Sequence, residues 1–561
     1  MSRTDAVAAD PRIRQLRERA EQLFRERSLL MSLWQEIAEN FYPERGEFTR
    51  KIYLGEEFAG ILNSSYPLLV RRELGDSLSA MLRPRDQDWF QITIERPDRL
   101  DRAGRAWLEW ASGVQRRAMY DKLSGFVRAT KEGDNDFAAF GQCVITRDID
   151  QAEQCLLYRN WHLKDVVWTE HYNGQIGEVF IRWRPTVRQL CRLFPAKVSQ
   201  KTKGRLQKEP NSTVECLRVI SMAANIEPAA GAKKHDCPWT LMYVECDSET
   251  VLEECGSRSR TFTIPRWQTV GSAQYAYSPA TICGLPDARL IQAMTLTLLE
   301  AGEMYTRPPM IATKQAIRSD LALYAGGVTW VDAEYDERLG EVLRPLTLDK
   351  GGMPIGTELT KDARDMLASA FYLNKLQLPP PQREMTAYET GQRIQEYIRQ
   401  AMPLFEPMET EYNGAMCEDT FEGLLGVNAF GSVYDMPQTV RGQDVRFVFE
   451  SPLHKAVERQ KGSQFLEMKQ LLLEAAQLDP VAAQTADAVK ALRDALTGIG
   501  TPQKWLRDEG AVRQLAQDAA VKQREQQLME SVSTGAATAQ QLGQAAKSLT
   551  GASPAVEGPA A

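Results

Sequence analysis

The sequence lacks most of the motifs on which catalysis commonly depends. It has only four histidines in 561 residues and no His-Glu-x-x-His motif, which leaves little for general-base or zinc-protease chemistry. A phosphate-binding Gly-x-x-x-x-Gly-Lys-Ser/Thr loop is also missing, and Gly423, Gly426 and Gly431 do not form a dinucleotide fingerprint. A nucleotide-driven motor would need the phosphate-binding loop. We therefore expect a protein that is not an enzyme and that uses no cofactor.

Long hydrophobic runs are absent as well. No stretch approaches the roughly 20 apolar residues of a membrane helix, and residues 1–10 are polar and lack the apolar core of a signal peptide. We expect a protein with no membrane partner that is made and kept in the cytosol of whatever cell expresses it. The apolar fraction of 43% and the charged fraction of 25% are typical of a soluble globular protein. A chain of 561 residues predicts several packed units.

The chain has no excess of positive charge. Its net charge is −7, whereas proteins that wrap duplex nucleic acid are usually basic, because their affinity comes from neutralising phosphates. If this protein meets DNA, we expect that it does not grip it along a broad surface.

The nine cysteines include no Cys-x-x-Cys pair, and we expect them to be reduced. His235, Cys237, Cys246 and Cys255 are four potential zinc ligands within 21 positions. Structural zinc sites favour ligand pairs two to four residues apart, and only His235 and Cys237 are that close. The spacing therefore predicts no metal site.

Residues 134–136 (Asp-Asn-Asp) resemble part of a calcium-binding loop. The glycine and the closing glutamate of such a loop are missing. We therefore predict that these residues form a polar turn.

Helical periodicity dominates the first part of the chain. Apolar residues at three- and four-residue steps from Ile13 to Phe41 predict one long helix that ends before Pro43. Further helices are predicted over residues 62–82 and 105–120, and the alternation in residues 88–94 predicts a strand.

From Cys143 to Trp267 the pattern changes to short β-prone runs, which predict an α+β domain with mostly antiparallel strands. The predicted strands cover residues 143–149, 156–163, 166–171, 178–183, 216–220, 239–245 and 261–265. Asn173-Gly174 predicts a hairpin turn between two of these strands. Residues 201–210 are polar, and we predict a loop there.

Two helices of matched length follow, at Pro286–Met304 and Glu358–Leu378, with a strand- and turn-rich insert between them. This arrangement predicts an antiparallel helical hairpin with the insert at its tip, closed by residues 351–354. Three prolines at 379–381 then hold the backbone in a stiff extended form. Taken alone, residues 377–383 also fit an ordinary connection between helices.

A new helix is predicted from Thr386, because Thr386 and Glu389 form a capping box. Pro403 and Pro407 should kink this helix, and the pattern continues over residues 417–425. The chain is helix-forming again from about residue 451 to 531. The last 30 residues have too little apolar mass to offset ordering entropy, so we predict disorder.

Four stretches, in this order and spacing, resemble a known family. They are residues 27–48 (RSLLMSLWQEIAENFYPERGEF), 80–92 (AMLRPRDQDWFQI), 305–310 (YTRPPM) and 385–392 (MTAYETGQ). Together they resemble the portal proteins, the head-to-tail connectors of tailed phages, and specifically those of short-tailed phages. The resemblance covers about residues 20–530.

The resemblance implies an α+β, mainly helical subunit of a twelve-membered ring at one capsid vertex, through which DNA enters and leaves. The implied parts are a wing (1–285, returning at 426–452), stem helices (286–304 and 358–378), a clip (305–357), a tunnel loop with a long kinked helix (379–425), a helical crown (453–530) and a disordered tail (531–561). The implied partners are double-stranded DNA, the terminase large subunit, the major capsid protein and scaffold, a tail adaptor protein and, at the crown, internal core proteins.

Candidate site residues follow from these parts. Tunnel-loop residues that could contact DNA are Lys375, Gln377, Gln382 and Arg383. Clip residues that could dock the terminase and later the tail are Arg307, Lys314, Arg318, Trp330 and Arg338. Stem residues that could be shared between neighbouring subunits are Leu290, Met294, Leu298, Met366, Ala370 and Phe371. Packing within one subunit is the alternative for the stem set, and both can hold.

Two other classes of protein compete with this interpretation. A nucleic-acid-processing enzyme with accessory helical domains would need clustered acids for magnesium within a strand-rich core, and the β-prone region shows no convincing spacing. A helical scaffolding protein would lack the long β-prone segment.

Overall fold

The structure is a computed structural model with two compact units. It describes residues 11–225, 237–306, 308, 310–312, 343–345, 352–376 and 407–449, apart from positions 54, 59, 61, 86, 151, 152 and 272, together with parts of 462–524. One unit comprises Met1–Pro97 and Trp107–Glu458, and the other comprises Asp98–Ala106 and Arg459–Ala561.

The N-terminal helices are α1 (Pro11–Glu26), α2 (Ser28–Phe41), α3 (Tyr66–Leu82), α4 (Arg102–Met119) and α5 (Phe126–Phe140), with short 3₁₀ turns at Pro43–Arg45 and Pro97–Arg99. The prediction of one continuous helix from Ile13 to Phe41 was wrong, because the helix breaks at Arg27. The Arg27 guanidinium is buried and donates to three backbone carbonyl oxygens of residues 163–166, at 2.6–2.8 Å. This tertiary contact holds the break in place.

A five-stranded antiparallel sheet has the order β4-β5-β6-β7-β8. Its strands are β4 (Val166–Glu170), β5 (Ile176–Trp183), β6 (Cys216–Met222), β7 (Trp239–Glu245) and β8 (Thr250–Ser257). The predicted turn at Asn173-Gly174 is confirmed between β4 and β5, where Gly174 has a φ of +76°. Strand β8 escaped prediction, because two glutamates interrupt its apolar alternation.

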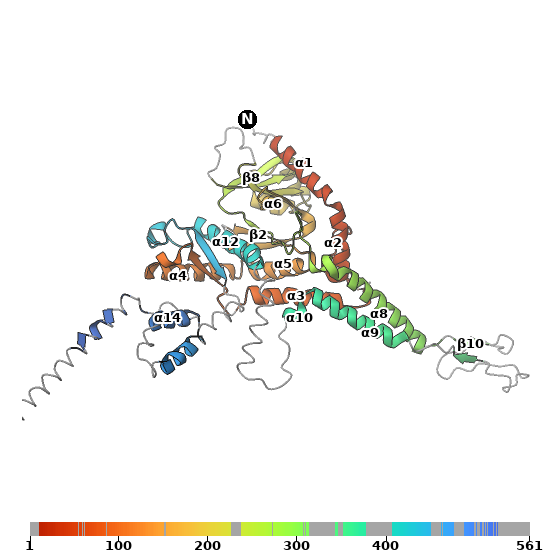
Figure 1. Ribbon diagram of the computed structural model, residues 1–561. Coiled ribbons are helices and arrows are strands. Elements are labelled where there is room, and N and C mark those ends of the chain that lie inside the picture. The colour runs from red at the N-terminus through yellow and green to blue at the C-terminus, as the bar shows by residue number, and fades with distance from the viewer. Residues whose placement is uncertain are drawn as a thin grey trace, which may run out of the picture. The chain divides into compact units, whose positions relative to one another are not determined.

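Helices cover both faces of this sheet (Figure 1). Helix α1 packs through Ile13 and Ala20 on one face. On the other face lie α6 (Val187–Leu193) and then α7 (Gln200–Lys208), after a short Pro-containing turn. The predicted loop at residues 201–210 was therefore wrong. The buried carboxylate of Glu245 accepts from the hydroxyl groups of Ser199 and Thr202, and it thereby holds the start of α7.

A three-stranded sheet of order β3-β2-β9 contains β2 (Val144–Asp150), β3 (Cys155–Trp161) and β9 (Phe262–Thr263), and a 3₁₀ turn at Leu163–Asp165 follows β3. A separate pair joins β1 (Phe90–Ile94) to β12 (Val445–Phe449), with Phe90 opposite Phe449. The pairing of β1 with β12 confirms the predicted strand near residues 88–94. It also brings segments about 350 positions apart in the sequence together.

A π-helical turn (Ala280–Gly284) leads into α8 (Leu285–Thr306), and α8 lies side by side with α9 (Gly352–Ala370), as Figure 1 shows. Between them, β10 (Met310–Ala312) pairs antiparallel with β11 (Leu343–Pro345). The first helix of the predicted hairpin is confirmed. The second was predicted from Glu358 to Leu378 but begins earlier and ends at Ala370, before the short α10 (Leu373–Leu376).

Two local features explain this difference in bounds. Pro354 lies in the first turn of α9, where a proline ring is tolerated, so residues 352–354 open the helix and do not close the insert. At the other end Tyr372 has a φ of +60°, which is incompatible with a right-handed helix.

The predicted triproline loop and the helix from Thr386 lie outside the described residues. The next described residues, from 407 onward, form a π-helical segment (Glu409–Gly414), α12 (Ala415–Gly426) and a 3₁₀ turn (Val433–Asp435). The predicted helix over residues 417–425 is confirmed. The second unit has helical residues 464–475 and α14 (Ala488–Gly498), and the predicted disordered tail lies outside the described residues.

Within the part of the chain that the structure describes, no helix is long and apolar enough to cross a membrane.

Candidate functional site: the helical hairpin and its buried polar anchors

Helices α8 and α9 pack closely because a glycine lies between them. A Cβ atom at Gly356 would lie 3.0 Å from Leu298 Cδ2 and 3.7 Å from Met294 Cε. Further contacts come from small and branched side chains, and Ala363 and Leu367 are buried. The hairpin therefore has one face that is filled within the chain.

The six predicted stem-packing residues divide into three groups. Leu290 and Met366 are exposed, with 44% and 53% of their surface accessible. Met294, Leu298 and Ala370 are half-buried. Phe371 is fully buried, and its ring centroid lies 5.2 Å from that of Phe41. Phe371 thus packs inside its own chain, whereas Leu290 and Met366 have surface available to a neighbour.

Polar contacts fix the base of the hairpin to the N-terminal helices. The Gln292 side-chain oxygen accepts from the backbone N–H groups of Asn63 and Ser64, at 2.8 and 2.9 Å, and its NH₂ group donates to the Ser64 carbonyl. The Tyr66 hydroxyl donates to the Arg364 carbonyl oxygen at 3.1 Å. Both helices of the hairpin are therefore bound at their base.

Of the predicted tunnel-loop residues, the structure describes only Lys375. It is exposed on α10, and its Nζ lies 5.5 Å from the centroid of the Tyr372 ring. The other tunnel-loop candidates (Gln377, Gln382 and Arg383) and the clip candidates (Arg307, Lys314, Arg318, Trp330 and Arg338) lie outside the described residues.

The Asp134-Asn135-Asp136 segment does not form the predicted polar turn. It lies in the interior of α5, and both carboxylates are buried. Asp136 accepts a bidentate pair of bonds from Arg45, at 3.0 and 2.6 Å, and a third from the Asn160 amide at 2.6 Å. A bidentate arginine satisfies a buried carboxylate more fully than a single donor could. This pairing keeps the charge of Asp136 compensated inside the helix.

Asp134 and Asn135 each face a different arginine. Arg83 pairs with Asp134 and also donates from Nη1 to the Asn413 side-chain oxygen at 2.8 Å. Arg71 donates to the Asn135 side-chain oxygen at 2.5 Å. Burial, the largest single influence, lowers the pKa of Arg83, but the charge and hydrogen bond of Asp134 together with Tyr412 outweigh it, and the net pKa is raised. Helix α5 is thus joined by a charge pair to Arg83 at the end of α3, and Arg83 also contacts the π-helical segment that precedes α12.

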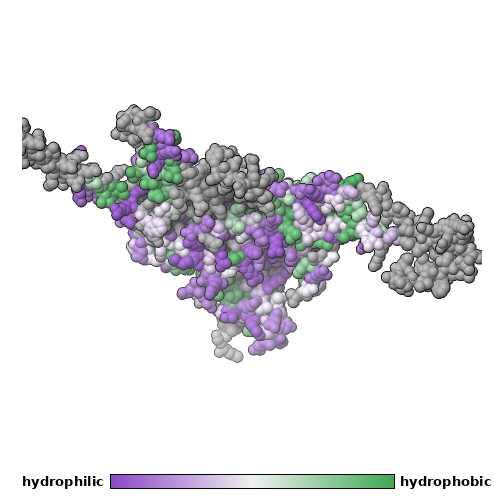
Figure 2. Space-filling model, turned by 90° about the horizontal axis from the view of Figure 1, so that it is seen from below, coloured by the Kyte–Doolittle hydropathy of each residue, from purple (hydrophilic) through white to green (hydrophobic). Residues whose placement is uncertain are grey.

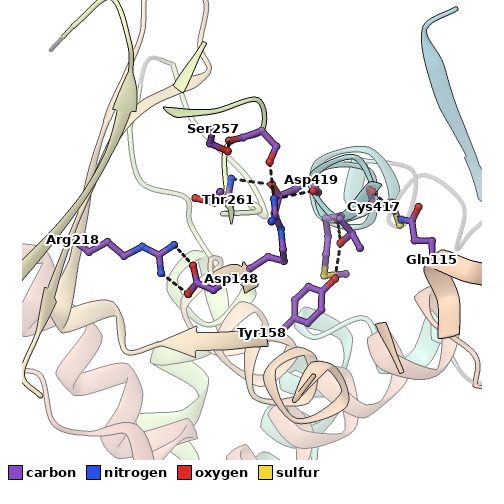
Figure 3. Close-up of polar contacts among 12 residues, drawn as sticks. Gln115, Asp148, Tyr158, Arg218, Ser257, Thr261, Cys417 and Asp419 are labelled. Carbon is purple, nitrogen blue, oxygen red and sulfur yellow. Dashed lines mark hydrogen bonds and ion pairs between the residues drawn. The ribbon is translucent and has the colours of Figure 1, made fainter. Parts of the chain in front are cut away.

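A second buried network holds α12 against the three-stranded sheet (Figure 3). Arg147 of β2 donates to both carboxylate oxygens of Asp419, at 2.8 and 3.0 Å, and the same carboxylate accepts from the Thr261 backbone N–H. Tyr158 of β3 is hydrogen-bonded to Thr420 at 2.6 Å. Because α12 lies at the end of the segment predicted as tunnel loop and kinked helix (379–425), this network anchors the end of that segment.

A neighbouring ion pair continues this network into the larger sheet. Arg218 of β6 is bidentate to Asp148 of β2, with both distances 2.7 Å, as Figure 3 shows. The two sheets are therefore connected by a partly buried salt bridge. Neither network was predicted, because an acid inside a helix or strand looks like a solvent-exposed charge until its partner is known.

The cysteine set considered for zinc is only partly described, since His235 lies outside the described residues. Cys237, Cys246 and Cys255 are free thiols. Burial raises the pKa of Cys246 to about 12, which keeps it protonated and weakens it as a metal ligand. Among the described residues, no group of three or more His, Cys, Asp or Glu side chains is arranged to hold a metal ion.

A sequence profile of one known family matches residues 14–506, which is most of the chain. The chain belongs to the bacteriophage head to tail connecting proteins. The resemblance drawn from the four sequence stretches is thereby confirmed. As a member of a family of connecting proteins, the chain is a structural component of the phage particle and not an enzyme.

Named relatives agree with this family. A "Probable portal protein" of Bordetella phage BPP-1 is 25% identical over 450 residues, which cover 78% of each chain. A "Portal protein" of Salmonella phage epsilon15 is 20% identical over 445 residues, again with 78% of each chain covered.

Two solved structures show a distant likeness, each at 9% sequence identity. For "Virion of native gene transfer agent (GTA) particle" the TM-score is 0.32, with 79% of this chain and 95% of that chain covered. For "Neck of native GTA particle computed with C12 symmetry" the TM-score is 0.34, with coverages of 72% and 85%. Likeness at this level carries no argument about assembly.

Proposed function

We propose that this chain is a portal protein, and that copies of it form a ring that conducts double-stranded DNA into and out of a phage head. The family and the named relatives support a connector between head and tail. The observation that carries the ring is an apolar stripe on α9 that remains exposed within the described part of the chain.

The stripe consists of Ile355, Leu359 and Met366, which are 61%, 52% and 53% exposed. Steps of four and seven residues place them on one side of a helix. The buried residues of α9 lie on a different side, at Gly356, Thr360, Ala363 and Leu367, and Gly356 faces Leu298 of α8. Figure 2 shows hydrophobic patches among hydrophilic ones along this hairpin. A second copy of the hairpin would bury the stripe, and such a heterologous contact closes into a ring when repeated by rotation.

The charge of the hairpin fits a surface that DNA passes without being held. Its exposed acidic residues are Glu300, Glu303, Glu358, Asp362 and Asp365. Among the described residues of the two helices, Arg289 is already paired with Glu36, and Lys361 is the exposed cation that remains. An acid excess repels phosphate, and it therefore avoids the affinity that each neutralised phosphate would add.

Within this proposal the α8–α9 hairpin is the stem, and residues 307–351 between its two helices are the clip that docks the terminase large subunit and later a tail adaptor protein. The N-terminal α+β region with its β12 return is the wing. Residues 453–530 form the crown. A ring of twelve subunits, contacts with capsid protein, scaffold and internal core proteins, and assembly in the host cytoplasm belong to the same proposal. Lys375, beside the tunnel loop, is the described candidate for a DNA contact.

Electron microscopy of the purified protein tests the ring. We expect rings with a central hole for the unmodified chain and for Met366→Leu, which preserves the apolar stripe. Met366→Glu should give folded single subunits, because a carboxylate would be buried without a partner at each interface. If Met366→Glu still forms unaltered rings, the apolar stripe is not part of the interface between subunits. Single subunits of the unmodified chain under all conditions, together with nuclease activity, would favour the competing enzyme.

A further inference from the structure

The segment from Arg182 to Lys208 is strongly basic within an acidic protein. It carries nine lysines and arginines and no aspartate or glutamate, although acids outnumber bases in the chain by 75 to 68. Such a concentration of one charge is costly unless an opposite charge covers it. The segment comprises the end of β5, both helices α6 and α7, and the turn between them.

The fold holds these cations on one outer layer. Helices α6 and α7 contact each other, and Val187, Leu190 and Val198 bury the inner side of the layer against the sheet. The outward side is basic. Its exposed cations, beyond Arg184, are Arg188, Arg192, Lys197, Lys201 and Lys208, and Lys203 is half-buried.

Most of this charge has no partner within the described part of the chain. Three of the nine cations are engaged: Arg182 lies over the Phe24 ring, Arg184 faces Glu215 at 4.0 Å, and Arg205 donates to Ser212. The other six form no salt bridge or side-chain hydrogen bond with a described residue. We call these six, Arg188, Arg192, Lys197, Lys201, Lys203 and Lys208, the α6–α7 surface.

The composition of the surface distinguishes between nucleic-acid ligands. Sites for single strands combine cations with exposed aromatic rings on which bases stack. Here the nearby aromatic residues Trp183 and Phe194 pack with Tyr243 against the α6 core. A surface of cations without stacking rings fits a regular phosphate backbone, which presents charge and no free bases.

We propose that the α6–α7 surface binds the phosphate backbone of duplex DNA, without sequence preference and outside any tunnel. The basic surface follows from the structure alone, whereas the choice of DNA among polyanions rests on the proposed function. A local grip of this kind is compatible with the net charge of −7, because the cations are confined to one layer.

Counterion release sets the expected size of the effect. If all six cations contact phosphates, the logarithm of the association constant should fall with the logarithm of salt concentration with a slope of about −5. Binding should then weaken roughly a thousandfold between 50 and 200 mM salt. Loss of one phosphate contact should reduce the slope by about 1.

Gly204 offers a matched pair of variants. It lies on α7 between Lys201 and Lys208, and a Cβ atom there would meet nothing within 4 Å. Gly204→Ala therefore adds no clash and no charge. Gly204→Glu occupies the same open space and places a carboxylate within reach of both lysines, three and four residues away.

The experiment measures binding of the purified full-length protein to relaxed, covalently closed circular duplex DNA. A closed circle cannot thread a preformed ring, so the tunnel contributes nothing. We expect salt-dependent binding that Gly204→Ala preserves. Gly204→Glu should weaken it at least tenfold and reduce the slope by about 2. Leu193→Ser should leave it unchanged, because an exposed leucine has no role on a phosphate backbone.

Equal binding by Gly204→Glu and Gly204→Ala would overturn the proposal. So would binding of poly-L-glutamate without binding of the DNA circle, which would indicate an acidic protein as the partner. The proposed function is judged separately by electron microscopy of the same samples. Protein that binds the DNA circle but forms no rings would contradict the portal function and support DNA binding by the α6–α7 surface. Rings that do not bind the DNA circle would support the portal function and contradict DNA binding by this surface.

Discussion

Replacing Gly423 by alanine should destabilise the protein, although the same change stabilises most helices. Gly423 lies in the interior of α12, where alanine is normally favoured by about 1 kcal/mol. A Cβ atom at this position would lie 2.5 Å from Arg147 Nη1 and 2.6 Å from its Cζ. The guanidinium cannot move aside freely, because it is buried and bonded to both oxygens of Asp419. The added methyl group must therefore displace the ion pair or the helix.

The magnitude follows from these two opposing terms. Breaking a buried salt bridge costs about 3–5 kcal/mol, since it leaves uncompensated charge inside the protein. The gain in helix propensity offsets about 1 kcal/mol. We expect a net loss of about 2–4 kcal/mol of unfolding free energy.

Urea unfolding, followed by tryptophan fluorescence, measures this loss. Gly426→Ala is the matched control, because Gly426 belongs to the same helix and a Cβ atom there meets nothing within 4 Å. The loss should also shrink when Gly423→Ala is made in an Arg147→Met background, since the obstructed group is then gone. If Gly423→Ala unfolds at the same urea concentration as Gly426→Ala, the close contact with Arg147 does not constrain α12.

Three further predictions follow from buried groups. Phe371→Ala should cost about 3–5 kcal/mol in urea unfolding, because the ring is fully buried, whereas Met366→Ala should cost little in the isolated chain; equal losses would contradict the assigned burial. Burial lowers the pKa of His162 to about 4 from 6.5, so its neutral form is favoured in the folded state. The free energy of unfolding should have its full value above pH 6.5 and fall by roughly 3 kcal/mol as the pH drops through 4. His162→Asn should reduce this dependence of stability on pH. Gly141→Ala should be strongly destabilising in a thermal melt, because Gly141 has a φ of +75° and a Cβ atom would lie 2.8 Å from the Ser278 nitrogen; an unchanged melting temperature would exclude that strain.

Much of the architecture could be predicted because periodicity and turn chemistry are local. Apolar residues at helical spacing identified α3 and α8, and Asn173-Gly174 marked the turn between β4 and β5. Alternation identified β1 and most strands of the five-stranded sheet. The order of four short stretches was sufficient to identify the family that the profile match confirms.

The errors came where a distant residue decides the local structure. The helix break at Arg27 depends on carbonyl groups more than 130 positions away. Helix α7 depends on Glu245, whose carboxylate holds Ser199 and Thr202. The buried acids of α5 were predicted to form a turn because their two arginine partners, Arg45 and Arg83, lie about 90 and 50 positions away in the sequence. No window of neighbouring residues contains these contacts.

The sequence by itself therefore determined the family, the helix and strand types with strong periodicity, and the absence of the phosphate-binding loop and of long apolar runs. Only the tertiary structure decided which charges are buried and paired, as for Asp134 and Asp419, and which remain available, as on the α6–α7 surface. It also separated Phe371, which packs inside the chain, from Met366, which does not. The physical reason is that side-chain periodicity is encoded by neighbours in sequence, whereas burial and pairing are set by neighbours in space.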